Sequence, residues 1–146
     1  MPRDIDIVLP AAQVDQFLHA ASVSGFQILA VPSGRWPKLV HRDTQVDVDI
    51  LPEGGRPGTP SKPAPTTIAH PSRLGASGTA LRYVHLPALI ELKLAAGRGQ
   101  DQADVIKLIQ TNPDQIAAIR EHLAHVHADY VSEFDRLAQQ AREEAD

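Results

Sequence analysis

The sequence predicts an α+β fold in which a β-sheet comes first and helices come last. Two observations lead to this prediction. The first half contains short runs rich in Ile, Val and Leu that are bounded by Pro and Gly, which is typical of strands. After Pro87, apolar residues recur at spacings of three and four, which indicates helices. We therefore expect a sheet region over 1–86 and a C-terminal helical region over 87–146 that packs on it, within one structural domain.

The composition is that of an ordinary soluble domain. At 146 residues the chain can bury a core, and with only 4% aromatic residues that core must come from Leu, Ile, Val and Ala. The net charge of −4 argues mildly against general nucleic-acid coating. The chain has no cysteine, which excludes disulfides and thiolate metal sites. No apolar run has the length of a membrane span and no signal peptide is visible, so we expect a cytoplasmic protein without a membrane partner.

Four segments of the first half are predicted to be strands, because they are rich in β-branched and apolar residues. They are RDIDIVL (3–9), FQILAV (26–31), KLVHR (38–42) and QVDVDIL (45–51). Between the first two, apolar residues at helical spacing predict a helix over 11–24, with Gly25 as a natural C-cap. PSGRWP is predicted to be a turn. Asp43-Thr44 suits the loop of a hairpin between the last two segments.

The segment that follows is expected to be irregular. Residues 51–66 are dense in Pro and Gly and predict a long surface loop, which in a compact domain is often functional. After it, TTIAHP and LRYVHL are short strand candidates. No internal repeat is visible.

The second half is predicted to form four helices, and Pro and Gly mark their ends. Pro87 begins the first helix, and Gly97 and Gly99 follow its last apolar residues. Asn112-Pro113 ends the second. The helices are expected over PALIELKLAAGR, DQADVIKLIQ, 114–125 and 128–144.

Two pairs of aspartates interrupt apolar strands. Successive side chains of a strand alternate between faces, so Asp4 and Asp6 share one face, as do Asp47 and Asp49. If the two strands are neighbours, three or four carboxylates converge, and a divalent cation such as Mg²⁺ would turn their repulsion into attraction. A site with two metal ions could hold the attacking and leaving oxygens of a phosphoryl or nucleotidyl transfer. Alternating acidic and apolar residues also describe any half-exposed strand, and both interpretations stay open at this point.

A second group of charges lies on the first two predicted helices. Lys93 sits on a largely apolar helix, and Arg98, Asp101 and Asp104 follow across a glycine-flanked turn. Asp101 and Asp104 are three residues apart and would share a helix face. The alternative is structural: acids near a helix start suit the macrodipole, and a lysine at a helix edge can extend its charge to water.

In their order along the chain, LPEGGRPG, HPSRLG and LPALIELKLAAGRGQDQADVIKLI resemble the nucleotidyltransferase superfamily, in particular the bacterial proteins related to AbiEii-type toxin nucleotidyltransferases. DIDIVLP resembles the first acidic strand of that family, and VDVDILPEG resembles the later strand that supplies the third acid. The resemblance runs from Arg3 to about Gln110. It implies a nucleotidyltransferase-like mixed sheet followed by C-terminal helices. It also implies Mg²⁺-dependent transfer of a nucleoside monophosphate from a nucleoside triphosphate to an RNA, protein or small-molecule acceptor.

The resemblance also implies roles for the acids of the strands. Asp4 and Asp6 would be ligands of one or two Mg²⁺ ions. Asp49, by its position before ILPEG, would be the third acid, which activates or orients the attacking hydroxyl and also faces the metal. Asp47 shares that face but fits the motif less well.

In the second half, the resemblance assigns nucleotide binding to the Lys93 helix and the Arg-x-x-Asp-x-x-Asp turn. Lys93 would meet the nucleotide phosphates as a point charge. Asp101 or Asp104 would position Lys93 or contact the nucleotide, and Arg98 would pair with these acids.

One motif of the family has no counterpart before Asp4. The family places a Gly-Gly or Gly-Ser pair in a helix-start turn ahead of the first acidic strand, where backbone amides help to seat phosphates. Only MPR precedes Asp4 here, and Gly54-Gly55 lie after the third acid. We therefore expect a sheet that is truncated at its N-terminal part. The chain is then either a shortened product or a family member that has lost nucleotide transfer. Such a member would be a non-catalytic protein that binds a partner, for example as half of a toxin–antitoxin pair, or an inactive remnant. The uncovered sheet edge would favour a homodimer.

These interpretations place the acids differently. An unrelated α+β domain would scatter Asp4, Asp6 and Asp49 over different faces, whereas a nucleotidyltransferase fold, active or not, keeps them close together. The histidines at 122, 125 and 127 are expected to mark a solvated helix end, since no third ligand accompanies them to form a metal site.

Overall fold

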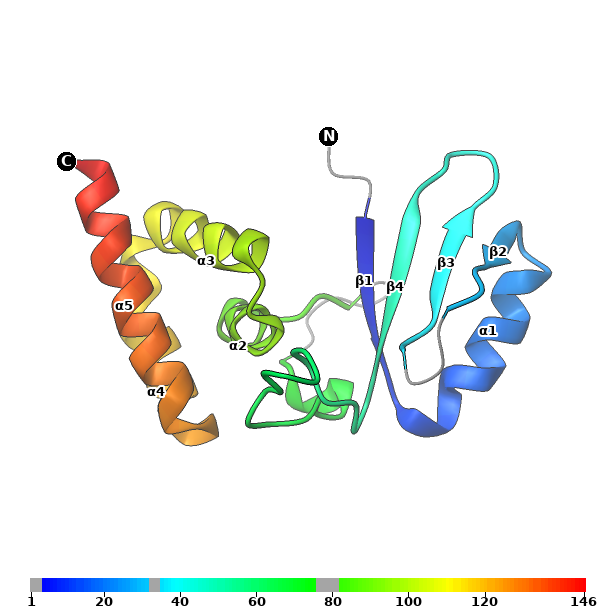
Figure 1. The fold of residues 1–146 in the computed structure, drawn as a ribbon, viewed down its shortest axis with the longest axis horizontal. Helices are drawn as coiled ribbons and strands as arrows, with labels where there is room; N and C mark the ends of the chain where they lie inside the picture. The colour runs from blue at the N-terminus through cyan, green and yellow to red at the C-terminus, as the bar shows by residue number, and fades with distance from the viewer. Residues whose placement is uncertain (1–3, 32–34, 76–81) are drawn as a thin grey trace. The chain divides into compact units, whose positions relative to one another are not determined.

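The computed structural model describes residues 4–31, 35–75 and 82–146, which form a four-stranded mixed sheet and five α-helices (Figure 1). The predicted α+β class is confirmed. The chain divides into two compact units, which we call the sheet unit and the helical unit. Their segments are Met1–Gly55 with Ile68–Pro71, and Arg56–Thr67 with Ser72–Asp146. The predicted packing of the helices on the sheet stays a prediction.

The sheet has the strand order β1-β4-β3-β2. Its strands are β1 (Asp4–Leu9), β2 (Phe26–Ile28), β3 (Lys38–His41) and β4 (Asp47–Pro52). β1 runs parallel to β4, whereas β4 pairs antiparallel with β3 and β3 with β2. The predicted hairpin is present between β3 and β4. Its loop is closed by two backbone bonds, from the His41 N–H to the Val46 carbonyl and from the Gln45 N–H to the His41 carbonyl.

One face of the sheet forms the core of this unit. Leu39, Val48 and Ile50 are buried on it, and they pack with helix α1 (Val14–Ser22) through Ala21. The partly buried side chains around this core are Ile7, Leu9, Val14, Phe17, Leu18 and Phe26. Because side chains alternate along each strand, this apolar face sends the neighbouring aspartates to the other side.

The helical unit contains the four predicted helices. They are α2 (Leu86–Ala96), α3 (Gly99–Thr111), α4 (Ile116–Val126) and α5 (Ala128–Ala145). Pro87 lies in the first turn of α2, and Gly97 ends that helix in the left-handed conformation, with φ of 68°. The core of the unit is built from the buried faces of all four helices, with Phe134, Leu137 and Ile119 among its fully buried side chains.

The Pro- and Gly-rich segment after β4 has no helix or strand, as predicted, yet it is anchored to the helical unit. Ala64 is buried in the helical core. The hydroxyl groups of Thr66 and Tyr130 are hydrogen-bonded at 2.7 Å, and the Arg56 guanidinium donates to the Ala64 carbonyl at 2.8 Å. Gly58, with φ of 90°, bridges Pro63 and turns the segment back on itself.

Some local expectations are wrong. The predicted helix over 11–24 begins with a short 3-10 turn (Ala11–Gln13), and only the first three residues of FQILAV form a strand. TTIAHP forms no strand: Ile68 instead exchanges two 2.8 Å backbone bonds with Gly54 and Gly55. LRYVHL forms no strand over its described residues, because α2 begins at Leu86. Residues 3, 32–34 and 81 of the predicted segments lie outside the described residues.

Two further 3-10 turns, Pro71–Arg73 and Pro113–Gln115, complete the described elements. Over the described ranges, none of the helices has both the length and the apolar character needed to cross a membrane.

Candidate functional site

The predicted acids of the sheet unit lie together. In the parallel pair of β1 and β4, Asp4 is the register partner of Asp47, and Asp6 is the register partner of Asp49. Register partners on adjacent strands point to the same side of the sheet, about 5 Å apart at their backbones. Asp4, Asp6, Asp47 and Asp49 therefore share one face, which we call the acidic face. The scattered arrangement expected of solvated, unrelated acids is not found.

The burial of the same two strands explains why these acids cannot turn inward. Val48 and Ile50 flank Asp49 in β4 and are 4% and 0% exposed, so they fix which face of the strand is the core. A slip of one residue would bury aspartates and expose this apolar pair. The acidic face is thus set by the register, with Asp4 and Asp6 exposed and Asp47 and Asp49 half-buried.

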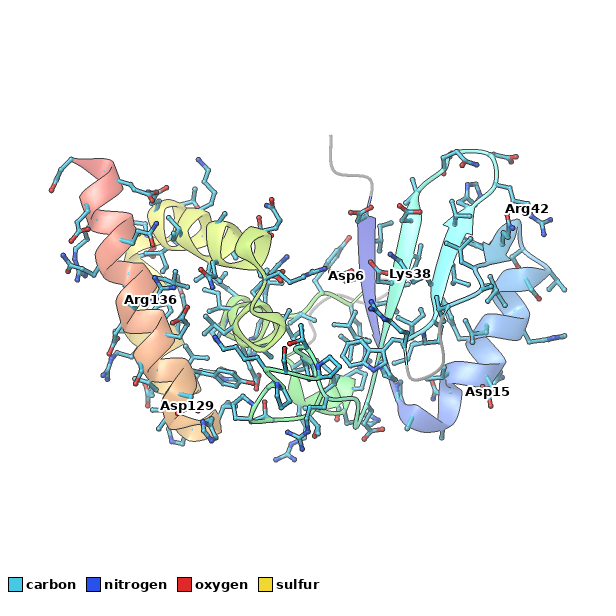
Figure 2. The ribbon with its side chains drawn as sticks, in the orientation of Figure 1. Asp6, Asp15, Lys38, Arg42, Asp129 and Arg136 are labelled. Atoms are coloured by element: carbon cyan, nitrogen blue, oxygen red, sulfur yellow. The ribbon has the colours of Figure 1, made fainter. Side chains whose placement is uncertain are left out.

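A lysine that was not singled out from the sequence also lies on this face. Lys38 of β3 is the antiparallel register partner of Asp49, and its Nζ lies 3.4 Å from Asp49 Oδ1. Figure 2 labels Lys38 and Asp6 on their strands. The sequence could have predicted this contact, because a hairpin centred on Asp43-Thr44 places Lys38 opposite Asp49. The ion pair is half-exposed, with side chains 48% and 36% exposed, so it contributes little stability.

The strand register brings the carboxylates of the acidic face onto neighbouring positions. Within residues 4–31, 35–75 and 82–146, no group of three or more His, Asp or Glu side chains is placed to hold a metal ion. The oxygens of Asp6 and Asp49 are hard donors of the kind Mg²⁺ prefers, and Mg²⁺ is usually held by only one or two carboxylates together with water and substrate phosphates. The donor chemistry therefore fits a Mg²⁺–nucleotide complex better than a bare ion.

The predicted nucleotide-binding residues of the helical unit also lie together, at the turn between α2 and α3. The Lys93 ammonium donates to Asp104 Oδ2 at 2.9 Å and lies 3.6 Å from Asp101 Oδ1. The Arg98 guanidinium donates to both Asp101 oxygens, at 2.7 and 3.3 Å. We call these four residues the Lys93 network. The left-handed Gly97 makes it possible, because it ends α2 abruptly and lets α3 begin beside the last turn of α2.

Asp101 has a structural role at the start of α3. Its side chain is 2% exposed, and its Oδ2 accepts the backbone N–H of Arg98 at 3.2 Å. A carboxylate at this position satisfies a helix-start donor and suits the positive end of the helix dipole. Asp101 therefore caps a helix and neutralises two cations with one carboxylate.

Asp104 completes the Lys93 network one turn further along α3. The hydrogen bond from Lys93 holds the pKa of the Asp104 carboxyl below its ordinary value, against the opposing effect of burial, and a bond from Gln100 adds to the lowering. Gln100 donates to Asp104 Oδ1 at 2.8 Å. Asp104 is therefore a carboxylate at neutral pH and keeps the Lys93 ammonium in place.

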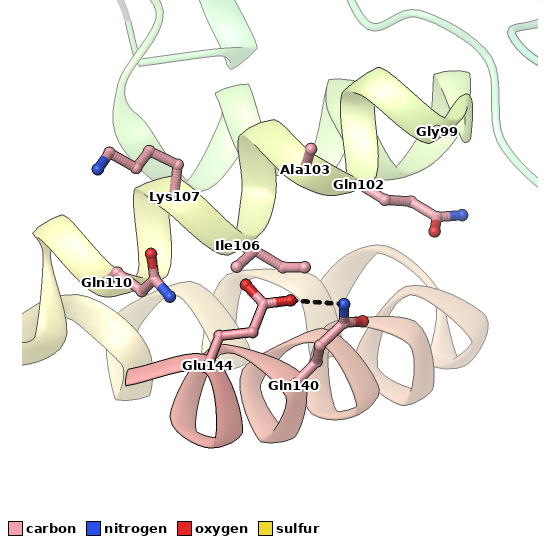
Figure 3. Close-up of a pocket in the computed structure, with 8 residues that line it drawn as sticks. All are labelled: Gly99, Gln102, Ala103, Ile106, Lys107, Gln110, Gln140 and Glu144. Atoms are coloured by element: carbon pink, nitrogen blue, oxygen red, sulfur yellow. Dashed lines mark hydrogen bonds between the residues drawn. The ribbon is translucent and has the colours of Figure 1, made fainter. Parts of the chain in front are cut away.

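The helical unit also has an open groove of about 360 Å³ between α3 and α5 (Figure 3). Its floor is Ala103 and Ile106, and Gln140 donates to Glu144 at its rim at 2.8 Å. The groove is rich in uncharged amides and includes none of the predicted site residues. We therefore assign no chemistry to it.

Comparisons with models of protein families, with curated proteins and with solved structures find no match for this chain. The resemblance to nucleotidyltransferases thus stays a prediction from sequence motifs. The geometry adds that the acids of each predicted set lie together within their own unit.

Proposed function

We propose that this chain has a nucleotidyltransferase-like fold and binds a Mg²⁺–nucleoside triphosphate complex at its acidic face. The reaction would transfer a nucleoside monophosphate to an RNA, protein or small-molecule acceptor. The observation that supports this most is the register of β1 and β4, which aligns two Asp-x-Asp pairs on one face, while Val48 and Ile50 on the opposite face of β4 belong to the core. If the aspartates were only the polar residues of half-exposed strands, the two Asp-x-Asp pairs would not need to lie side by side on adjacent strands.

Each acid has a stated role in the proposal. Asp4, Asp6 and Asp49 would hold Mg²⁺, which when bound supplies positive charge to the phosphate oxygens. Asp49 would also orient the acceptor hydroxyl and accept its proton as the acceptor oxygen bonds to the α-phosphorus and pyrophosphate leaves. In the helical unit, Asp101 and Asp104 hold Lys93 in position, and Arg98 pairs with Asp101.

A second candidate is a non-catalytic binding protein on the same scaffold, such as one component of a toxin–antitoxin pair. The Lys93 network favours it, since the Lys93 ammonium is already neutralised by Asp101 and Asp104. A lysine so engaged can serve the structure of the α2–α3 turn without meeting a phosphate. Binding and turnover must therefore be tested separately.

The first experiment is a calorimetric titration of the chain with each nucleoside triphosphate in the presence of Mg²⁺. We expect saturable binding that is lost in Asp4→Asn and Asp6→Asn. Asp43→Asn is the matched control, because Asp43 is an exposed acid of the same unit in the β3–β4 loop. Binding that survives both substitutions would contradict the proposed site.

Turnover is tested by incubating the chain with a triphosphate labelled at the α-phosphate and candidate acceptors. Label that moves to an acceptor, and does so less in Asp49→Asn, supports the enzyme. Binding without any transfer would favour the non-catalytic candidate, and absence of both would remove the nucleotide from the proposal.

A further inference from the structure

Helix α2 begins with an unusual N-cap, the imidazole of His85. Its Nδ1 accepts the backbone N–H of Ala88 at 3.0 Å, and its carbonyl accepts the N–H of Leu89 at 3.0 Å. Pro87, in the same turn, has no backbone N–H and needs no acceptor. N-caps are usually Ser, Thr, Asp or Asn, whose oxygens accept at any pH near neutrality. His85 accepts the same kind of helix-start N–H, but its acceptor is a ring nitrogen that can be protonated.

The bond from Ala88 defines the state of the ring. A nitrogen that accepts an N–H cannot itself carry a proton, so His85 must be neutral with its proton on Nε2. A second proton at Nδ1 would turn the acceptor into a donor facing another donor. It would also place a positive charge at the positive end of the helix dipole. Protonation therefore opposes the cap in two ways.

The described neighbours of His85 include a second histidine and a carboxylate that this histidine already engages. The ring of His122, from α4, meets it edge-on with centroids 5.4 Å apart. The Nε2 of His122 lies 3.3 Å from Glu91 Oε2, so the carboxylate in this cluster is already engaged by the second ring. The ring also lies against Gly75, where His85 Cδ2 leaves no room for a Cβ atom. The expectation of a solvated helix end is therefore wrong for His122.

We propose that His85 is an acid-sensitive latch on α2: its neutral ring holds the first turn closed, and protonation releases that turn. The latch lies wholly within the helical unit and does not depend on the proposed nucleotide site. Its contribution is present while the ring is neutral and is lost when the ring is protonated.

Two other histidines of the helical unit respond differently and serve as comparisons. His127 caps α5 in the same way, accepting the Asp129 N–H at 3.1 Å, but the Asp129 carboxylate lies 3.8 Å from the same nitrogen and would hold the protonated ring. His125 does the reverse of a cap: its Nδ1 donates to the Glu121 carbonyl at 2.8 Å near the end of α4. That bond survives protonation, and a cation is favoured there.

The test is amide hydrogen exchange of the full chain by NMR, at about pH 8 and about pH 5.5. We expect the protection factor of the Ala88 amide to fall about fivefold between these conditions in the wild type. In His85→Asn it should stay level, because Asn is a good cap that does not titrate. His85→Ala should be low at both pH values, and His125→Asn is the matched control that should behave as the wild type.

Two results would overturn the latch. One is an equal fall in His85→Asn and the wild type, which would place the acid sensitivity elsewhere. The other is long-range ¹⁵N NMR that finds the proton on Nδ1 of His85 at the higher pH. A protection factor of the Ala88 amide that stays the same at both pH values in the wild type would also overturn the latch. If His85→Ala does not fold, the comparison of His85→Asn with the wild type still tests the proposal.

Discussion

The acids of the two units differ in what surrounds them. In the helical unit, Asp101 is buried and its oxygens accept from the Arg98 backbone and side chain, with the Lys93 ammonium nearby. In the sheet unit, Asp4 and Asp6 lie exposed beside Asp47 and Asp49, and Lys38 contacts Asp49. The first group is ordered by its own hydrogen bonds, whereas the second is aligned by strand register. Charges aligned by register repel each other, which is the arrangement that a bound cation would relieve.

This contrast predicts opposite results for the removal of one charge. A substitution in the Lys93 network should cost stability, because it leaves buried or partly buried partners without their counter-charge. Removal of a carboxylate from the acidic face should instead relieve repulsion among the acids, and so increase stability, when no cation is present. The sign of the change, measured without metal, therefore separates a structural acid from a site acid.

The largest effect is expected at Asp101. Asp101→Ala should lower the free energy of unfolding by about 2 kcal/mol, since it removes a helix-start acceptor and the partner of two cations. Denaturant unfolding followed by circular dichroism would measure it. Asp101→Asn should lose less, because its amide oxygen can still accept the Arg98 N–H.

The control for this change is Asp114→Ala, which removes an exposed acid before α4. A cost at Asp101 no greater than the cost at Asp114 would contradict the structural role of the Lys93 network.

The next effect is expected at Asp6 and has the opposite sign. Asp6→Asn should raise the melting temperature in metal-free buffer, by the equivalent of about 0.5 kcal/mol, because like charges on neighbouring strands repel. The same variant should lose Mg²⁺ binding in a calorimetric titration. Destabilisation of the metal-free chain would instead make Asp6 a structural residue and end the site interpretation.

Lys38→Met should change stability and Mg²⁺ binding in the directions opposite to those expected for Asp6→Asn. It removes the cation beside Asp49, so metal-free stability should fall slightly while binding of Mg²⁺ alone becomes about twofold tighter. Asp43→Asn in the loop should change neither quantity.

The smallest effect is expected from acid titration of Asp104. The hydrogen bond from Lys93 holds the pKa of this carboxyl below its ordinary value of 3.8, so its contribution to stability is present above that value and is lost as the pH falls. Asp104→Asn should cost about 0.3 kcal/mol at neutral pH, and the difference from the wild type should disappear in acid. Unfolding curves at a series of pH values would test this, and a difference that persists in acid would contradict it.

Much of the candidate site follows from local rules. Alternation along a strand places Asp4 with Asp6 and Asp47 with Asp49, without knowledge of the sheet. The spacing of Asp101 and Asp104 places both on one face of a helix in the same way, whereas their meeting with Lys93 was predicted only by the family resemblance. The pairing of β1 with β4 is different, because it joins strands separated by a helix and two other strands, and no local pattern specifies that neighbour.

The fold shows the same limit of local reasoning. The ends of α2 and α3 were predictable, because Pro87, Gly97 and Asn112 act through their own backbones, whereas α1 ends at Ser22, before the predicted cap Gly25. TTIAHP has β-branched content and still forms no strand, since Ile68 pairs with two glycines near the end of β4. The division into units was also not predictable, since it depends on contacts such as Thr66 with Tyr130 that span 64 residues.

The Pro- and Gly-rich segment after β4 belongs to the helical unit although part of the sheet unit follows it in the sequence. The boundary between the units is crossed after Gly55, after Thr67 and after Pro71, so each unit is assembled from separated stretches of sequence. A gene fragment that began at Ser72 would encode all four helices yet lack Ala64 from their core and the Thr66 partner of Tyr130. Recombination at a single breakpoint therefore cannot exchange one unit without cutting into the other, and the two are inherited as one piece.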